Sequence, residues 1–416
     1  MRKDLPSSSR RRLIAGAGAA AGLGALGMTR ALAAEVGGTS ALGFAELPDG
    51  ALAGQVLYAL PGKVPLIKKT FRPPNFETPV EYFRAPVTAN NAFFVRYHLA
   101  AIPQVKAAEW SLAVGGDSAE RELKLSLDEL KKAFKPAEII AVCQCSGNRR
   151  GLFEPHVTGV QWGVGAMGNA LWRGVRLKDV LAKAGVKAGA LEVVFDGADR
   201  APLEKTPDFI KSLPLDVAMD ENTLIAFEMN GKPLPLWNGY PARLVVPGWT
   251  GTYWIKHLTS VKIVAQPEKN FWMSTAYRLP RGLFKTPTFQ SQLYAPNEPI
   301  TAMVVNSLVT SLKNGQQFAR GKPLEVKGIA WDGGSGIERV EVSLDGSTWQ
   351  TAKLGREISR FSFREFELRL PARESGAMVV MARATSRAGE TQVERLIHNG
   401  PGYHHNVIQR LYVEVV

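Results

Sequence analysis

Short apolar or alternating stretches, rather than long helical repeats, dominate the middle of the chain, and they are typical of strands with at least one buried face. They predict strands at residues 93–99, 139–142, 191–195, 223–229 and 243–246. Residues 110–114 and 122–125 flank the turn residues Gly115-Gly116-Asp117 and predict a hairpin.

Few segments have the period of an amphipathic helix. Ser126 and Glu129 fit a capping box, and Leu127, Leu130 and Phe134 form one apolar face behind it. A second short helix is predicted at 177–184. Short strands mixed with few, short helices predict an α+β domain.

The sequence pattern changes at about Pro299, after which predicted short strands are separated by turn residues roughly every 8 to 12 positions. This spacing predicts an immunoglobulin-like β-sandwich over residues 299–416, without the Cys and Trp framework of antibody domains. The first domain then spans residues 34–298. Its beginning, up to about Pro74, is rich in Gly and Pro and has no sustained period, which predicts an extended arm over the domain.

Residues 1–33 have the pattern of an export signal. A basic stretch precedes an apolar run at 13–28, and Ala31-Leu32-Ala33 forms a small-residue cleavage site. The segment Ser9-Arg10-Arg11-Arg12-Leu13-Ile14 resembles a twin-arginine signal, which predicts export of a folded protein to the periplasm. A membrane anchor is disfavoured, because the run is mostly Gly and Ala and is shorter than the roughly 20 strongly apolar residues of a span.

The charge of the chain favours an anionic substrate or partner. The 416 residues include 51 Lys and Arg against 38 Asp and Glu, a formal charge of +13. Removal of the predicted leader, with six basic residues and one acidic residue, leaves +8. Nucleic acid is not expected, since no basic stripe interleaved with aromatic residues appears downstream of the leader.

Cys143 and Cys145 are the only cysteines, so the chain has no disulfide framework. The six His include no HxxxH pair and no CxxCH occurs, which excludes zinc hydrolases and covalent haem. Three interpretations of the thiols stay open: a strained disulfide, a pair of inert buried thiols, and a reactive or metal-bound Cys145. The following residues 146–150 have donors and no core character, and the guanidinium groups of Arg149 and Arg150 would lower the pKa of a nearby thiol and attract oxyanions.

Residues 163–168 match GxGxxG. The motif follows no convincing strand and opens no clear helix, so a dinucleotide site is disfavoured. A glycine-rich loop in which one backbone approaches another closely is predicted instead.

Several motifs occur in a fixed order: Phe94-Val95-Arg96-Tyr97-His98, Gln144-Cys145-Ser146-Gly147-Asn148, Asn238-Gly239-Tyr240-Pro241, Leu244-Val245-Val246-Pro247-Gly248, Trp254-Ile255-Lys256-His257-Leu258, and Phe271-Trp272-Met273 ending in Tyr277. Together they resemble the sulfite oxidase family of molybdenum enzymes, and within it the bacterial periplasmic sulfite dehydrogenases. The resemblance extends from about Thr70 to the C-terminus. It implies a sulfite-oxidase-like molybdopterin domain followed by an immunoglobulin-like dimerisation domain.

The resemblance also implies roles for individual residues. Cys145 would be the protein's sulfur ligand to molybdenum, with the pyranopterin dithiolene and oxo groups completing the coordination. The substrate-pocket residues would be Arg96, His98, Arg150 and Tyr277. The cofactor-binding residues would be Phe94, Arg96, His98, Cys145, Asp199, Asn238, Arg243 and Lys256. Asn238 stands where the vertebrate enzymes have His, and no haem is expected in this chain.

The implied function is periplasmic oxidation of sulfite to sulfate, with electrons passed to a c-type cytochrome and the sandwich forming a homodimer or heteromer. A sulfane dehydrogenase subunit of a thiosulfate-oxidising complex is the alternative within the fold. A methionine sulfoxide reductase fits less well, because such subunits generally lack a C-terminal sandwich. An exported binding or assembly protein with inert thiols is the alternative of another class.

Overall fold

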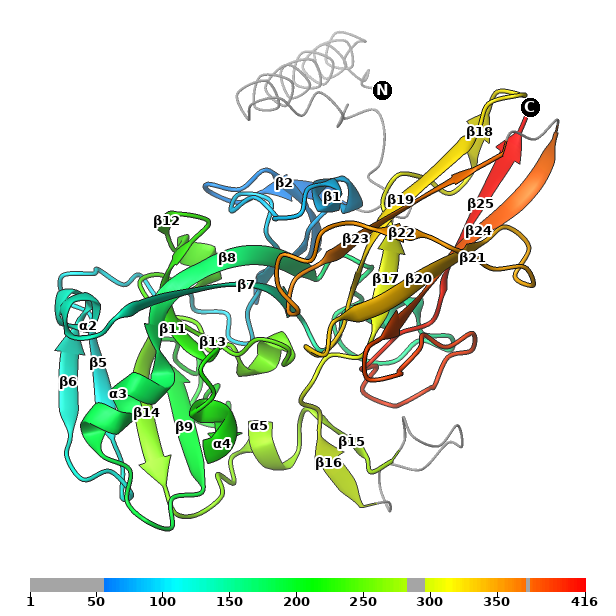
Figure 1. The fold of residues 1–416 in the computed structure, drawn as a ribbon. Coiled ribbons are helices and arrows are strands. Elements are labelled where there is room, and N and C mark those ends of the chain that lie inside the picture. The colour runs from blue at the N-terminus through cyan, green and yellow to red at the C-terminus, as the bar shows by residue number, and fades with distance from the viewer. Residues whose placement is uncertain (1–55, 283–295, 372–374) are drawn as a thin grey trace, which may run out of the picture.

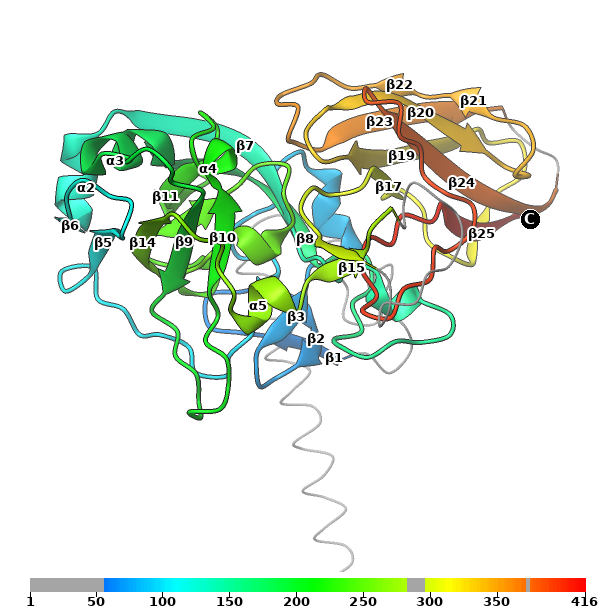
Figure 2. The ribbon, with the colours of Figure 1, turned by 90° about the horizontal axis from the view of Figure 1, so that it is seen from below.

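The computed structural model describes residues 56–282, 296–371 and 375–416 (Figure 1). They form two lobes, an α+β domain and a C-terminal β-sandwich, which lie side by side in both views (Figures 1 and 2). The predicted export signal and the first part of the predicted arm lie outside the described residues. Within the described ranges, none of the helices has the length and apolar character needed to cross a membrane.

The later part of the predicted arm is a small sheet, so that prediction is wrong for residues 56–77. Four antiparallel strands form it in the order β1 (Val56–Ala59), β2 (Pro65–Thr70), β3 (Asn75–Glu77) and β4 (Val95–Arg96). The strand predicted at 93–99 is therefore limited to β4. These strands are too short to display a period of two, and the buried cluster that holds them joins Leu66 and Phe76 to the distant Tyr97.

Two larger sheets form the body of the α+β domain. One has the order β10 (Lys211–Pro214), β9 (Glu192–Gly197), β14 (Leu258–Val264), β5 (Ser111–Gly115) and β6 (Leu123–Ser126). The other has the order β12 (Lys232–Pro233), β11 (Leu224–Met229), β8 (Met167–Arg176) and β7 (Pro136–Gln144), with β13 (Arg243–Val245) paired to β11. The predicted hairpin is the antiparallel pair β5–β6, and the strands predicted at 139–142, 191–195, 223–229 and 243–246 correspond to β7, β9, β11 and β13.

The helices of the described chain are short. They are α2 (Leu127–Ala133), α3 (Leu177–Ala184), α4 (Leu215–Ala218) and α5 (Phe271–Ser274), with 3-10 turns η1 (Val80–Arg84), η2 (Arg150–Leu152), η3 (Leu236–Asn238) and η4 (Gly251–Tyr253). The capping box is confirmed, because the Glu129 amide donates to Ser126 Oγ at 3.3 Å and the Ser126 amide donates to Glu129 Oε2 at 2.8 Å. The helix predicted at 177–184 is α3.

The predicted sandwich is confirmed. One sheet has the order β17 (Asn306–Val309), β19 (Leu324–Trp331), β23 (Arg364–Leu370) and β22 (Lys353–Leu354). The other has the order β18 (Gln316–Phe318), β25 (Gln409–Val415), β24 (Gly376–Ser386), β20 (Ile337–Ser343) and β21 (Gln350–Thr351). Val326, Val340 and Val380 lie in the fully buried cluster between the sheets. A short pair, β15 (Arg278–Pro280) and β16 (Asn297–Pro299), lies between the domains in the sequence.

The two domains share a buried interface. One apolar cluster joins Val142 and Met167 of the first domain to Trp331 and Phe363 of the sandwich. The Val142 amide also donates to the carbonyl of Phe361 at 2.9 Å, so the free edge of β7 is covered by a sandwich loop. The interface is therefore part of the folded core of this chain.

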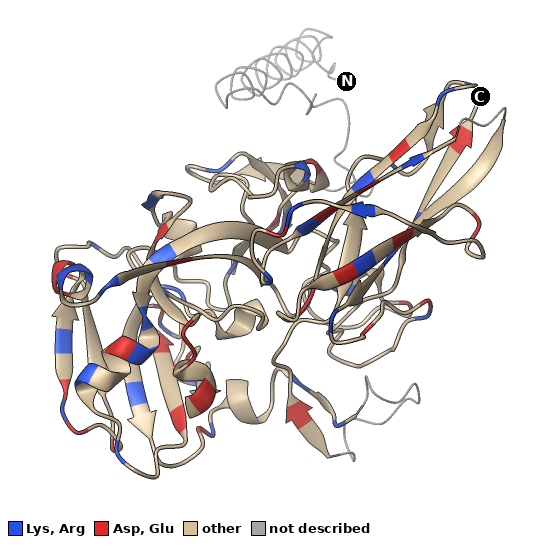
Figure 3. Cartoon of the chain, viewed as in Figure 1, with Lys and Arg blue, Asp and Glu red and all other residues tan. Residues whose placement is uncertain are grey.

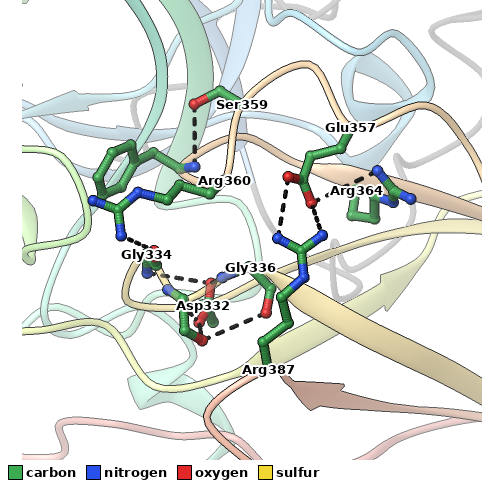
Figure 4. A network of polar contacts seen from close by, with 10 residues as sticks. Asp332, Gly334, Gly336, Glu357, Ser359, Arg360, Arg364 and Arg387 are labelled. Atoms are coloured by element: carbon green, nitrogen blue, oxygen red, sulfur yellow. Dashed lines mark hydrogen bonds and ion pairs between the residues drawn. The ribbon is translucent and has the colours of Figure 1, made fainter.

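A polar network holds the sandwich loops beside this interface (Figure 4). The Asp332 carboxylate accepts from the amides of Gly334 and Gly336 at 3.2 and 3.0 Å, and Arg360 donates to the carbonyl of Gly334 at 2.9 Å. Next to it, Arg387 donates to the Glu357 carboxylate at 2.6 Å. The network explains why these loops keep one conformation against the first domain.

Charged residues of both signs are interspersed over both lobes (Figure 3).

Candidate active site

A small cavity of about 40 Å³ lies in the α+β domain where separate stretches of the chain converge. Eight of the ten predicted site residues line it: Phe94, Arg96, His98, Cys145, Asn238, Arg243, Lys256 and Tyr277. They come from the segments after β3, after β7, around η3 and β13, and after α5. The fold therefore assembles in one cavity residues that are up to 183 positions apart in the sequence.

Strand β7 delivers Cys145 to this cavity, and the glycine-rich loop 163–168 supports it there. The Cys145 amide donates to the carbonyl of Ala166 at 2.9 Å, and the Ala166 amide donates to Asn148 Oδ1 at 3.0 Å. The Arg149 amide donates to the carbonyl of Gly163 at 2.7 Å. The backbone around the thiol is thus fixed from both sides.

The same loop depends on the first small sheet. The Glu77 carboxylate accepts from the amides of Gly163 and Gly165 at 2.7 and 2.9 Å, and it pairs with Lys69 at 3.0 Å. A Cβ at Gly165 would collide with the carbonyl of Thr78. The prediction of a glycine-rich loop with close backbone approach is confirmed.

Cys143 and Cys145 are both buried free thiols, so the disulfide alternative is wrong. Both line the cavity, because residues two apart on a strand point to the same face. Burial raises the pKa of Cys143, and its sulfur accepts a contact from the Arg243 guanidinium at 3.8 Å. Cys143 is therefore held as a neutral packing group beside Cys145.

Arg243 is buried between two indole rings, with its guanidinium carbon 5.0 Å from the ring centre of Trp172 and 5.6 Å from that of Trp254. It donates to the carbonyls of Asn238 and Trp254 at 2.9 and 3.1 Å, and its Nε is buried without a hydrogen-bond partner. Burial lowers the pKa of Arg243. Within the described residues, it makes no ion pair.

Lys256 is a second cation that lines the cavity, and its side chain is half-buried. Its Nζ donates to the carbonyl of Arg96 at 2.8 Å and lies 4.4 Å from the ring centre of Tyr97. Burial, together with the neighbouring Arg243, lowers the pKa of Lys256 to about 7. Asp199 is near enough to oppose this shift, but it lies behind the cavity wall rather than on it.

Lys63 is a functional residue that sequence reasoning missed. From the loop between β1 and β2, its Nζ donates to Asn238 Oδ1 at 2.7 Å and to the carbonyls of Asn90 and Phe93 at 2.7 and 3.0 Å. It thereby fixes the orientation of the Asn238 amide, whose Nδ2 donates to the carbonyl of Phe94 at 3.3 Å. No motif marks this lysine, since it belongs to the segment interpreted as an arm.

Three of the predicted substrate residues lie together in the same cavity. Tyr277 has a left-handed backbone, with φ of 58°, and its hydroxyl bonds His98 Nε2 and lies 3.5 Å from an Arg96 nitrogen. The His98 ring stacks on Phe209 with centroids 3.5 Å apart. Burial and the nearby Arg96 lower the pKa of His98, so the ring is neutral at physiological pH rather than poised to titrate there.

The two consecutive arginines diverge, which corrects the prediction that both guanidinium groups lie near Cys145. Arg149 donates to the carbonyls of Val407 and Ser307 in the sandwich at 3.2 and 2.7 Å. The left-handed backbone of Arg149, with φ of 68°, turns the chain between the two side chains. The turn 146–150 also has core character, since Ser146, Asn148, Arg149 and Arg150 are all buried.

Arg150 lies behind the cavity lining but next to it. Its guanidinium carbon is 5.2 Å from the ring centre of Tyr403, which in turn stacks on Tyr277 with centroids 5.5 Å apart. Its Nε donates to the carbonyl of Pro401 at 2.9 Å. The Arg150 charge is near enough to Tyr277 to oppose the rise of that group's pKa, so it acts on this part of the cavity electrostatically.

The cavity suits an anionic, hydrogen-bonding cofactor with a soft metal. Within the described residues, the buried Arg243 and the half-buried Lys256 have no paired carboxylate, and two polar atoms at the lining, Arg243 Nε and Ser146 Oγ, are buried without a hydrogen-bond partner. Such charges and donors are costly unless an anion or acceptor joins them. A free buried thiol in the same cavity offers the soft ligand. The residues present thus fit a phosphate-bearing molybdenum pyranopterin.

Comparison with known proteins agrees with this geometry. Residues 98–272 match the family model described as oxidoreductase molybdopterin binding domain, and residues 297–416 match the Mo-co oxidoreductase dimerisation domain. The sulfite oxidase of Gallus gallus is 32% identical over 335 residues, covering 77% of this chain and 71% of that protein. The mitochondrial sulfite oxidase of Homo sapiens is 38% identical over 317 residues, covering 72% of this chain but only 56% of the human protein.

Among solved structures, the sulfane dehydrogenase SoxCD from Paracoccus pantotrophus superimposes with a TM-score of 0.72 at 24% identity, covering 91% of this chain and 92% of that chain. That likeness shows the fold. The molecule is a molybdopterin-dependent oxidoreductase with a dimerisation domain. The chain belongs to the sulfite oxidase family. The match to the molybdopterin-binding family model confirms the predicted molybdenum–pyranopterin cofactor.

Proposed function

We propose that this chain oxidises sulfite to sulfate in the periplasm and passes the electrons to a c-type cytochrome. The observation that carries the proposal is the convergence of Arg96, His98 and Tyr277 in the cavity that Cys145 also lines, with Arg150 one aromatic ring away from Tyr277. Overall, sulfite and one water give sulfate, two protons and two electrons. Two one-electron cytochromes can accept the two electrons in turn.

The cofactor side of the cavity is the part lined by Cys145, Arg243 and Lys256. The Cys145 sulfur would hold the metal, and the two cations would hold the pterin and its phosphate by charge-assisted hydrogen bonds. Asn238 would offer its amide nitrogen, because Lys63 already occupies its oxygen. When bound, the molybdenum centre supplies the oxygen-atom transfer and accepts the electron pair.

The substrate side is the part lined by Arg96 and Tyr277. Arg96 would bind a sulfite oxygen by a charge-assisted hydrogen bond, and Arg150 adds a second positive charge behind it. Tyr277 would donate its single proton to a substrate oxygen without adding charge, with the neutral His98 protonated at Nε2 and donating to the phenol oxygen. Burial raises the pKa of Tyr277, so this group stays a donor at neutral pH.

The proposal is tested by purifying the full chain with its leader, measuring bound molybdenum and following cytochrome c reduction on addition of sulfite. We expect molybdenum to be retained and reduction to depend on sulfite. If the protein retains molybdenum but does not reduce cytochrome c when sulfite is added, then either the proposed substrate or the proposed acceptor is wrong. Ferricyanide as acceptor then separates the two cases, because it requires no docking surface.

A protein-bound sulfane is the second candidate substrate, in view of the likeness to SoxCD over 91% of the chain. Tyr277 and Arg150 are 7% and 8% exposed, which favours a small free anion over a sulfur atom carried by another protein. Assays with free sulfite and with a persulfide-bearing carrier protein, on the same preparation, distinguish the two. The dimerisation domain would form either a homodimer or the interface with a second subunit.

A further inference from the structure

A segment of the sandwich, residues 398–405, covers the turn that carries Arg150. The rings of His398 and His405 contact the Phe153 ring with centroids 5.7 and 5.5 Å apart. Phe153 directly follows η2 (Arg150–Leu152) and is fully buried. The two ends of the segment are therefore fixed on one residue of the first domain.

Between these ends the segment makes a tight turn held by its own residues. Asn399 Oδ1 accepts from the Tyr403 amide at 2.9 Å, and Asn399 Nδ2 donates to the Tyr403 carbonyl at 3.0 Å. The Gly402 amide donates to the carbonyl of Asn399 at 3.1 Å. Asn399 is 1% exposed and Tyr403 is 8% exposed, so both ends of the turn are buried.

The Tyr403 ring lies between the two substrate-side groups. One face of the ring system stacks on Tyr277 with an interplanar angle of 16°, and the Arg150 guanidinium approaches the ring at 5.2 Å. The carbonyl of Pro401 accepts from Arg150 Nε at 2.9 Å. Within the described part of the chain, no protein group bonds the Tyr403 hydroxyl, so the contacts are made by the ring.

We infer that Tyr403 is a positioning residue through which the sandwich sets the orientation of Arg150 and Tyr277 toward the anion. The inference rests on the proposed function and extends it, because the substrate side is then completed by the second domain. Stacking restricts the Tyr277 ring to one orientation, and the cation–π contact restricts the guanidinium to one side of it. An anion bound at these groups meets donors that are already oriented, which lowers the entropy cost of binding.

The test compares Tyr403→Leu with Tyr403→Phe in the full, molybdenum-loaded chain. Leucine fills much of the space but has no ring face, whereas phenylalanine keeps the ring and loses only the hydroxyl. Tyr412→Leu is the matched control, since Tyr412 is 57% exposed on β25 of the same domain. Readouts are KM and kcat for sulfite, sulfate affinity by titration calorimetry, and bound molybdenum.

We expect Tyr403→Leu to raise KM for sulfite and to weaken sulfate binding by about tenfold each, because the stacking and cation–π contacts are lost. The reduction in kcat should be smaller, and the amount of bound molybdenum should not change. Tyr403→Phe and Tyr412→Leu should stay within about twofold of the parent protein. Unchanged KM and sulfate affinity in Tyr403→Leu would overturn the inference, as would equal impairment in Tyr403→Phe. If the loaded parent protein binds sulfate but oxidises no sulfite, the proposed function fails while the sulfate comparison still decides the role of Tyr403. A parent protein that binds no sulfate overturns the inference as well.

Discussion

Three glycines surround the guanidinium of Arg150, and Gly147 is the one where a methyl group tests the site most directly. A Cβ built at Gly147 would lie 2.5 Å from the guanidinium carbon. Ordinary contacts between such atoms are about 3.5 Å or longer, so the guanidinium would have to move by roughly 1 Å. Its bond to the carbonyl of Val160, at 3.3 Å, would be lost or distorted by that shift.

Gly147→Ala should therefore lower kcat/KM for sulfite by about ten- to hundredfold, or roughly 1.4–2.7 kcal/mol, as expected for a misplacement of about 1 Å in a binding group. The free energy of unfolding should fall by about 1–3 kcal/mol, because the new methyl group overpacks the site of the buried Arg150 guanidinium. Steady-state kinetics and a thermal melt on the molybdenum-loaded protein measure both effects.

A double-mutant cycle with Arg150→Met separates this cause from others. If Gly147 acts through Arg150, adding Gly147→Ala to Arg150→Met should cost almost nothing further. Gly355→Ala in the sandwich, where the nearest atom to a new Cβ is the Glu365 Cβ at 3.2 Å, controls for the substitution itself. A full effect of Gly147→Ala in the Arg150→Met background would refute the reasoning, as would unchanged kinetics in the single variant.

Three further outcomes are expected. The Cys145→Ser variant should contain no molybdenum above background, whereas the Cys143→Ser variant should retain the metal, because only Cys145 is assigned as the ligand. Equal molybdenum content in the two variants, measured by mass spectrometry, would contradict that assignment. In metal-free protein, the pKa of Lys256 is about 7 in the folded state, against 10.5 in the unfolded state. Between pH 7 and 10.5 the unfolded state therefore binds more protons than the folded state, and the free energy of unfolding rises with pH. Lys256→Met should reduce this slope by up to about 1.4 kcal/mol per pH unit in urea unfolding at pH 7 to 10, and an unchanged slope would show that Lys256 does not contribute. Arg149→Ala should lower the free energy of unfolding by about 3 kcal/mol, because two carbonyls of the sandwich lose a charged donor. Arg121→Ala, at an exposed position, is the control and should change it by at most about 0.5 kcal/mol. Equal losses in the two variants would exclude the interdomain role of Arg149.

The parts of the fold that could be predicted from sequence are those fixed by neighbouring residues. The capping box at Ser126, the β5–β6 hairpin and the strands of the sandwich all depend on turn residues and local periodicity. The first sheet escaped prediction, since β1, β2 and β3 are 4, 6 and 3 residues long and are stabilised by contacts with Tyr97. Local pattern carries no information about such distant partners.

The candidate site shows the same division. The motifs predicted Cys145 and the cavity residues, but the sequence could not indicate that the side chains of Arg149 and Arg150 point in different directions. That difference arises from the left-handed backbone of Arg149, which two adjacent arginines do not reveal. Lys63 and Tyr403 belong to segments with no chemical motif and contact the site across 175 and 126 positions of sequence, respectively. Their roles follow only from tertiary packing.

The covered edge of β7 has a consequence for anyone who wishes to shorten this protein. β7 is the last strand of its sheet, and in the intact chain the Phe361 carbonyl accepts the Val142 amide that the edge would otherwise present. A truncated first domain would expose both that amide and the apolar residues around it, and unprotected edges of this kind recruit other strands. Such a fragment would aggregate during expression.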